Sequence, residues 1–103
     1  MKSVLQKNRR CLLCGKTLDL ESHHVMYGPL RSVSEREGLK VWLCPLHHRG
    51  NRGVHFNRNA DLTVKKWAEA KYVSIYGKER WMQCFGRDYE DAEPSGFRVV
   101  EGL

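Results

Sequence analysis

The chain has 103 residues and a formal net charge of +6, with 41% hydrophobic and 29% charged residues, which is the composition of one small globular domain. Its apolar runs are far shorter than the ~20 residues that a membrane-spanning helix needs, so the sequence predicts no membrane association. Residues 1–7 contain no apolar run of the secretory kind. We therefore expect a cytoplasmic protein, in which cysteine thiols stay reduced and serve metal or redox chemistry.

The basic charge is concentrated in the first part of the chain. Residues 1–58 contain 11 Lys and Arg against 4 Asp and Glu, whereas residues 59–103 contain 7 against 8. All five histidines also lie in the basic part. This coincidence favours a polyanionic partner near the histidines, although a solvated basic surface would give the same count.

The N-terminal part predicts a basic arm and a metal-binding turn. Residues 1–10 are basic and polar and are expected to form an arm or a first short element. They lead into Cys11-Leu12-Leu13-Cys14, a Cys-x-x-Cys pair. Gly15 follows and lets the chain turn so that backbone N–H groups face the thiolates, which is typical of a zinc knuckle.

Two strands and a loop are expected next. Residues 18–26 predict a strand that carries His23 and His24 near its end. Because side chains alternate along a strand, these two histidines are expected on opposite faces, which suits one ligand and one base. Residues 27–38, with a Gly-Pro turn signal and polar filling, predict a loop, and the alternating residues 39–43 predict the second strand.

A second pair of metal ligands lies at a predicted helix start. Pro45 is favoured at the first helical position, and Cys44-x-x-His47 therefore offers two ligands from one turn. The 29 residues between the two pairs are enough for a β-hairpin, whereas a redox Cys-x-x-Cys would need a βαβ context that is absent here. We predict structural Zn²⁺, with His48 as the next candidate for the fourth ligand. The expected ligands are Cys11, Cys14, Cys44 and His47.

The last third of the chain is predicted to be helical up to residue 87. Asn59 or Asp61 can cap a first helix, in which apolar residues recur at the i, i+3, i+4 spacing until Gly77 ends it. Residues 78–85 predict a second short helix. The aromatic residues of both helices are expected in the core rather than on a base-stacking surface. Residues 88–103 predict an acidic, poorly ordered tail.

Four short motifs follow one another along the chain. They are Cys11-Leu12-Leu13-Cys14, His23-His24-Val25, Leu43-Cys44-Pro45-Leu46-His47-His48 and Gly53-Val54-His55-Phe56-Asn57. Together they resemble the HNH endonucleases of the ββα-metal fold, in the zinc-bound form found in phages and prophages. The resemblance spans about residues 11–89. It implies an α+β fold with a zinc-stabilised ββα-metal core over residues 11–58, on which two C-terminal helices in residues 59–87 pack.

The resemblance also implies roles for individual histidines. In that family the first residue of the paired position binds a catalytic divalent cation, and the second is the general base. Carried over to this chain, His23 is a ligand of one Mg²⁺, Mn²⁺ or Ni²⁺ ion and His24 deprotonates the attacking water. His48 matches a second ligand of that cation. His55 stays open between a third ligand, a phosphate contact and a structural histidine.

One position departs from the family pattern. Many members carry an Asn at the start of the second strand, where this chain has Gly38-Leu39-Lys40. That Asn usually orients the base loop or a ligand. Asn57 or Asn51 is the alternative that the sequence offers for its role.

These inferences predict an enzyme, an HNH-type endonuclease that hydrolyses DNA phosphodiester bonds in phage or prophage DNA processing. A homodimer or a phage protein partner stays open. The alternatives are a non-catalytic zinc module that binds DNA and an assembly or adaptor protein. Arginine offers a bidentate fork for phosphate, although each arginine alone is equally well a solvated surface charge. The candidate DNA-binding residues are Arg31, Arg49, Arg52 and Arg58.

Overall fold

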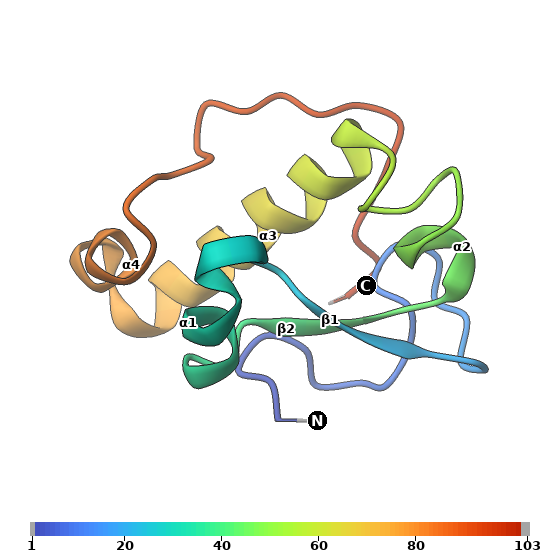
Figure 1. Ribbon diagram of the computed structural model, residues 1–103, viewed down its shortest axis with the longest axis horizontal. Coiled ribbons are helices and arrows are strands. Elements are labelled where there is room, and N and C mark those ends of the chain that lie inside the picture. The colour runs from blue at the N-terminus through green and yellow to red at the C-terminus, as the bar shows by residue number, and fades with distance from the viewer. Residues whose placement is uncertain (1, 102–103) are drawn as a thin grey trace.

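The computed structural model describes residues 2–101, and its only sheet within that range is a two-stranded antiparallel hairpin (Figure 1). Strand β1 (Glu21–His24) pairs with strand β2 (Lys40–Leu43), and His24 lies directly opposite Lys40. The first strand is shorter than predicted because the chain still turns at Asp19, whose φ is 56°. A residue with that φ lies outside the extended region that a strand requires.

The expectation of an irregular loop over residues 27–38 is wrong. This stretch contains one turn of 3-10 helix (Gly28–Leu30) followed directly by helix α1 (Arg31–Arg36). The buried Ser34 hydroxyl donates to the carbonyl of Leu39 at 2.6 Å, so α1 is tied to the start of the second strand. This tertiary contact therefore stabilises a helix that is too short to be stable alone.

Helix α2 (Pro45–His48) begins at the predicted proline, and helix α3 (Arg58–Tyr76) is the longest element. The residue that caps α3 is Asn57, whose side chain accepts a hydrogen bond from the first turn of the helix. The structure thus corrects the predicted caps, Asn59 and Asp61, which lie inside the helix. Asparagine is among the best residues for this position because its oxygen satisfies an otherwise unpaired backbone N–H.

Helix α4 (Lys78–Phe85) has the predicted bounds. Gly77 separates it from α3 with φ of 92°, and Gly86 follows it in the left-handed conformation with φ of 74°. A residue with a side chain adopts neither conformation readily, which explains why both helices end at glycine.

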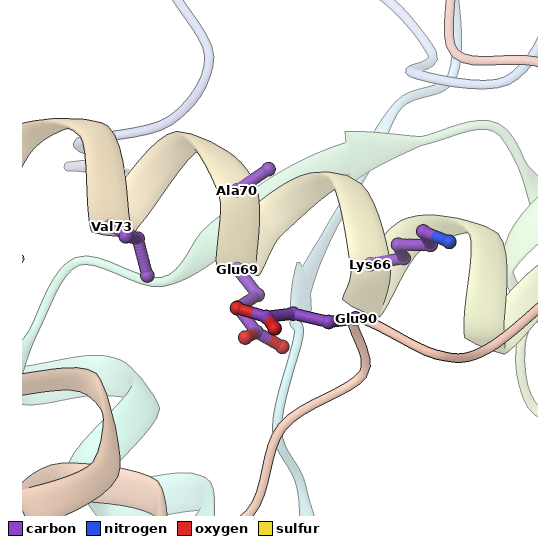
Figure 2. Close-up of a pocket in the computed structure, with 5 residues that line it drawn as sticks. All are labelled: Lys66, Glu69, Ala70, Val73 and Glu90. Atoms are coloured by element: carbon purple, nitrogen blue, oxygen red, sulfur yellow. The ribbon is translucent and has the colours of Figure 1, made fainter. Parts of the chain in front are cut away.

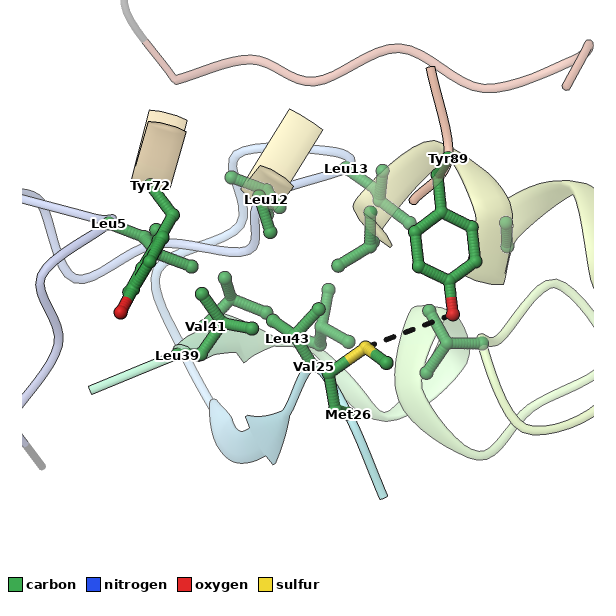
Figure 3. Packing of buried hydrophobic residues seen from close by; sticks show 14 of the residues in the cluster. Leu5, Leu12, Leu13, Val25, Met26, Leu39, Val41, Leu43, Tyr72 and Tyr89 are labelled. Atoms are coloured by element: carbon green, nitrogen blue, oxygen red, sulfur yellow. Dashed lines mark hydrogen bonds between the residues drawn. The ribbon is translucent and has the colours of Figure 1, made fainter. Parts of the chain in front are cut away.

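The core lies between the hairpin and helix α3, and leucines of the N-terminal segment also enter it (Figure 3). Helix α3 contributes residues four apart, which place one face of the helix on the sheet. Trp81 and Phe85 of α4 are also buried, as expected for a core role of the aromatic residues. Each such side chain contributes roughly 1.5–3 kcal/mol through its burial. The buried residues of α3 on this face are Ala60, Val64, Ala68 and Tyr72.

The two ends of the chain differ from the predicted arm and poorly ordered tail, because both pack on the core (Figure 1). Leu5 is 1% exposed, and the Gln6 side chain accepts the N–H of Trp42 at 2.8 Å. The C-terminal segment runs from α4 back across α3, and the Val100 N–H donates to the carbonyl of Leu12 at 2.8 Å.

The domain is a small compact α+β unit with a radius of gyration of 12.6 Å, close to the ~13 Å typical of a folded chain of this length. Among the described residues, no helix combines the length and the apolar character needed to cross a membrane.

Candidate metal centres

Three cysteines and one histidine form the first cluster. Cys11 and Cys14 come from the N-terminal turn, whereas Cys44 and His47 flank the start of α2, and their ligand atoms all lie within 4.8 Å of one another. Sγ of Cys14 is 3.7 Å from Sγ of Cys44, and Nδ1 of His47 is 3.3 Å from the latter. Ligands of a tetrahedral zinc ion lie about 3.5–3.8 Å apart, given bonds of ~2.3 Å to sulfur and ~2.1 Å to nitrogen. The cluster is compatible with a structural metal such as zinc.

The thiols of this cluster are free cysteines. The 3.7 Å between Sγ of Cys14 and Sγ of Cys44 is far longer than the ~2.05 Å of a disulfide. Burial raises the pKa of Cys11 to about 11 and lowers the pKa of His47. A metal ion that binds here must displace the thiol proton, so its affinity falls as the pH falls.

Three further histidines form a second cluster. His23 from β1, His48 from the end of α2 and His55 from the loop before α3 place their ligand nitrogens within 4.8 Å of one another. Nε2 of His48 lies 3.2 Å from Nε2 of His55. Two nitrogens that bind one metal ion at ~2.1 Å lie about 3.0–3.4 Å apart, so this spacing fits a shared cation. His55, whose role the sequence left open, thus lies with the two predicted ligands.

The state of His23 also suits a ligand. Its Nε2 is buried and has no hydrogen-bond partner among residues 2–101, which would be costly for a polar atom without a further ligand. Burial, followed by the charges of His48 and His55, lowers the pKa of His23 to about 3. The imidazole is therefore neutral at pH 7 and keeps a lone pair for a metal.

A cavity of about 210 Å³ opens beside this cluster. It brings together both histidines of β1, the other two cluster histidines, and one of the predicted arginines. His24 lines the same cavity although it is not one of the converging ligands. The lining residues are Ser22, His23, His24, Tyr27, Arg31, His48 and His55.

Glu21 supports the second cluster from behind, and sequence reasoning did not find it. Its Oε1 is 2.7 Å from Nδ1 of His48, and its Oε2 is 2.7 Å from a guanidinium nitrogen of Arg49. The hydrogen bonds from Arg49 and then from His48 lower the pKa of Glu21 to about 2. A carboxylate that accepts Nδ1–H leaves Nε2 of His48 as the ligand atom, which is the usual arrangement behind a metal-binding histidine. The sequence feature that could have identified Glu21 is its position two residues before His23, which places both side chains on the same face of the strand.

His24 has a separate partner on α1. Its Nε2 lies 2.9 Å from Oε1 of Glu35, and the other carboxylate oxygen lies 2.7 Å from Nζ of Lys40. Lys40, and then His24, lowers the pKa of Glu35 to about 2. The two histidines of β1 therefore contact different elements, since His23 packs against α2 and His24 against α1, and both also line the same cavity.

The four predicted DNA-binding arginines fall into two groups. Arg31 lines the histidine cavity, and Arg58 lines an adjoining hollow with His55. Arg49 is paired with Glu21, and Arg52 donates to the carbonyl of Gly96 and stacks on the ring of Phe97 at 4.4 Å. The structure thus places Arg31 at the histidine cavity and Arg58 at the adjoining hollow, and it engages the other two arginines in contacts within the chain.

A different cavity of about 200 Å³ lies on α3, away from both clusters (Figure 2). Its two carboxylates, Glu69 and Glu90, each lie 2.7 Å from Nζ of Lys78. This bridge joins the C-terminal segment to the helices, so the cavity is part of how the chain end packs.

Comparisons of the chain with protein-family models, with curated proteins and with solved structures give no match.

Proposed function

We propose that this protein is a metal-dependent endonuclease of the HNH type that hydrolyses DNA phosphodiester bonds. The observation that carries the proposal is the convergence of three imidazole nitrogens on a cavity that a fourth histidine also lines. Three protein ligands leave coordination positions for water or substrate, whereas a structural site is filled by four. A module that only binds DNA or assembles with a partner needs no such opening.

The residues have distinct roles in this proposal. His23, His48 and His55 hold the divalent cation, which when bound stabilises negative charge that develops on the phosphate. His24 takes a proton from the attacking water, since a neutral imidazole is an effective base near pH 7. Arg31 is exposed at the cavity and offers a fork of donors to a phosphate of the bound strand.

The first cluster supports this arrangement through its place in the chain. His47, of the first cluster, and His48, of the second, are neighbours in α2. A structural ion on the first cluster therefore fixes the helix that presents His48 to the cavity. Such fixing matters because a catalytic group displaced by a fraction of an ångström loses much of its effect.

Plasmid cleavage tests the proposal directly. Purified zinc-loaded protein is incubated with Mg²⁺, Mn²⁺ or Ni²⁺, with EDTA as the metal-free arm, and compared with the His24→Ala variant. We expect nicking or linearisation that depends on the cation and that falls roughly 10²- to 10⁴-fold in the variant. Zinc content and melting temperature serve as the check that both proteins are folded. Absence of cleavage with every cation, from folded protein, would contradict the proposal.

The second candidate is a non-catalytic zinc module that binds DNA or acts in assembly. The observation that favours it is the start of the second strand, Gly38-Leu39-Lys40, which has no Asn where many members of the resembled family carry one. His24→Ala leaves DNA binding by such a module intact, and an assembly protein shows no salt-dependent DNA affinity. The same proteins, titrated onto labelled duplex DNA at several salt concentrations, separate these two from a nuclease.

A further inference from the structure

A chain of charged contacts links His24 to the second strand. Nε2 of His24 lies 2.9 Å from Oε1 of Glu35, and Oε2 of Glu35 lies 2.7 Å from Nζ of Lys40. Lys40 is also the register partner of His24 in the hairpin. The three side chains therefore come from both strands and from α1 and meet at one end of the sheet.

We propose that Glu35 is the positioning residue for His24, and that Lys40 holds Glu35 in place for this task. The inference rests on the proposed nuclease function, to which it adds the group that orients the base. Together Glu35 and Lys40 take over the orienting role for which the sequence offered only Asn57 and Asn51. Asn57 is engaged elsewhere, because its side chain caps α3.

The chemistry of the contact decides which nitrogen of His24 is the base. An ionised carboxylate only accepts hydrogen bonds, so Nε2 of a neutral His24 carries the hydrogen and donates it to Glu35. Nδ1 then keeps the lone pair and accepts the proton of the attacking water. The resulting imidazolium has a hydrogen on each nitrogen, and Glu35 stays ionised and stabilises that positive charge. The hydroxide left by the water forms the new bond to phosphorus, and the leaving oxygen departs with its electron pair.

The three side chains differ in exposure, so a mutation of the exposed one can test positioning without a large loss of folding stability. The side chains of His24 and Lys40 are 14% and 7% exposed, whereas that of Glu35 is 57% exposed. Because the Glu35 carboxylate is mostly solvent-exposed, water screens its ion pairs and they contribute little to folding. Removal of Glu35 is therefore expected to change the orientation of His24 while the fold remains stable.

The test measures the tautomer of His24 and the kinetics of cleavage in the same set of zinc-loaded proteins. Two-bond ¹⁵N–¹H correlation spectra report which ring nitrogen carries the hydrogen. We compare wild type, Glu35→Ala and Glu35→Gln, with Glu79→Ala as the matched control, because Glu79 is an exposed glutamate on α4. The glutamine variant retains an oxygen that can accept from Nε2 but has no charge.

We expect wild type and Glu79→Ala to show the Nε2–H form, Glu35→Ala to show a mixture, and Glu35→Gln to lie between them. In plasmid cleavage, kcat of Glu35→Ala is expected to fall about 10- to 100-fold with KM unchanged, and Glu35→Gln to recover part of the loss. Lys40→Met, which keeps the buried stem, is expected to lose less than Glu35→Ala.

Three outcomes overturn the inference. A wild-type His24 with its hydrogen on Nδ1 contradicts the assigned contact, whatever the activity. A Glu35→Ala variant that retains wild-type kcat, while His24→Ala is inactive, removes the positioning role and leaves the proposed nuclease intact. Wild-type protein that cleaves nothing overturns the proposed function, and the positioning role with it.

Discussion

The two clusters of potential metal ligands include neighbouring residues, His47 in the first and His48 in the second, yet they differ in ligand chemistry and in access. The first has three sulfurs and one nitrogen, and all but Cys14 of its residues are buried. The second has only nitrogens, buries only His23, and borders a cavity of about 210 Å³. Three thiolates and one imidazole fill the four positions of a structural ion, whereas three imidazoles would leave coordination positions open. One turn of helix therefore serves two sites because adjacent residues point to different sides.

The largest effect is expected from the first cluster. Cys44→Ser, or treatment with a strong chelator, should lower the melting temperature by roughly 20 °C or more, because in a small domain metal binding is part of the folding free energy. Circular dichroism melting with metal content by mass spectrometry measures this. Cys84→Ser is the matched control, since Cys84 lies outside both clusters, and it should cost at most ~1 kcal/mol. A chelated protein that melts like the untreated one would refute the structural role.

The adjacent histidines give the sharpest separation of the two clusters. We expect His47→Ala to lose structural zinc and to melt early, and His48→Ala to keep zinc and fold while cation-dependent cleavage is lost. The two residues differ by one position in the same helix, so general damage to α2 would affect both alike. Metal stoichiometry and calorimetric titration with Mn²⁺ or Ni²⁺ measure the difference. Equal behaviour of the two variants would break the comparison.

A mutation of Glu21 tests whether its hydrogen bond to His48 affects cation binding by the second cluster. Glu21→Gln removes the charge that faces His48 and Arg49, and we expect the affinity for the second cation to fall about 10- to 100-fold. Structural zinc and melting temperature should change little, since Glu21 is not a ligand of the first cluster. Calorimetric titration of the variant beside Glu79→Ala measures this. An unchanged cation affinity would show that His48 needs no such partner.

The smallest effect is expected at Glu37, which belongs to neither cluster. It shows how much an ion pair away from the clusters contributes to the free energy of unfolding. The hydroxyl of Tyr72, and with it Arg80, lowers the pKa of Glu37 from 4.5 to about 2, and Glu37 is 8% exposed. Because the folded-state pKa is depressed, this stabilisation is present above pH 4.5 and is lost as the pH falls towards 2.

We therefore expect Glu37→Gln to cost about 1–2 kcal/mol at pH 7, and the difference from wild type to shrink between pH 4.5 and pH 2. Urea denaturation of both proteins across this range measures the difference. Both contain the same metal clusters, so the effect of acid on those clusters cancels. A difference that grows on acidification would show that the sign is wrong.

Several parts of the fold could be predicted from the sequence because their causes are local. The bounds of α4 follow from glycines on each side, and α2 starts at a proline that favours the first helical turn. Helix α1 was missed because its six residues show no apolar periodicity and depend on the Ser34 contact with Leu39. The packing of the C-terminal segment was also missed because it depends on a contact between residues distant in sequence. The Val100 N–H donates its hydrogen bond to the carbonyl of Leu12.

The sequence by itself determined the composition of the first cluster, because each ligand pair lies three residues apart and one tight turn brings such a pair together. It also identified the histidines of the second cluster, through a resemblance, but left the role of His55 open. Only the tertiary structure decided that His55 converges with His23 and His48, since their backbones come from a strand, a helix and a loop. Glu21 and Glu35 were likewise revealed only by contacts across the fold, because ion pairs between distant residues depend on strand register and helix docking.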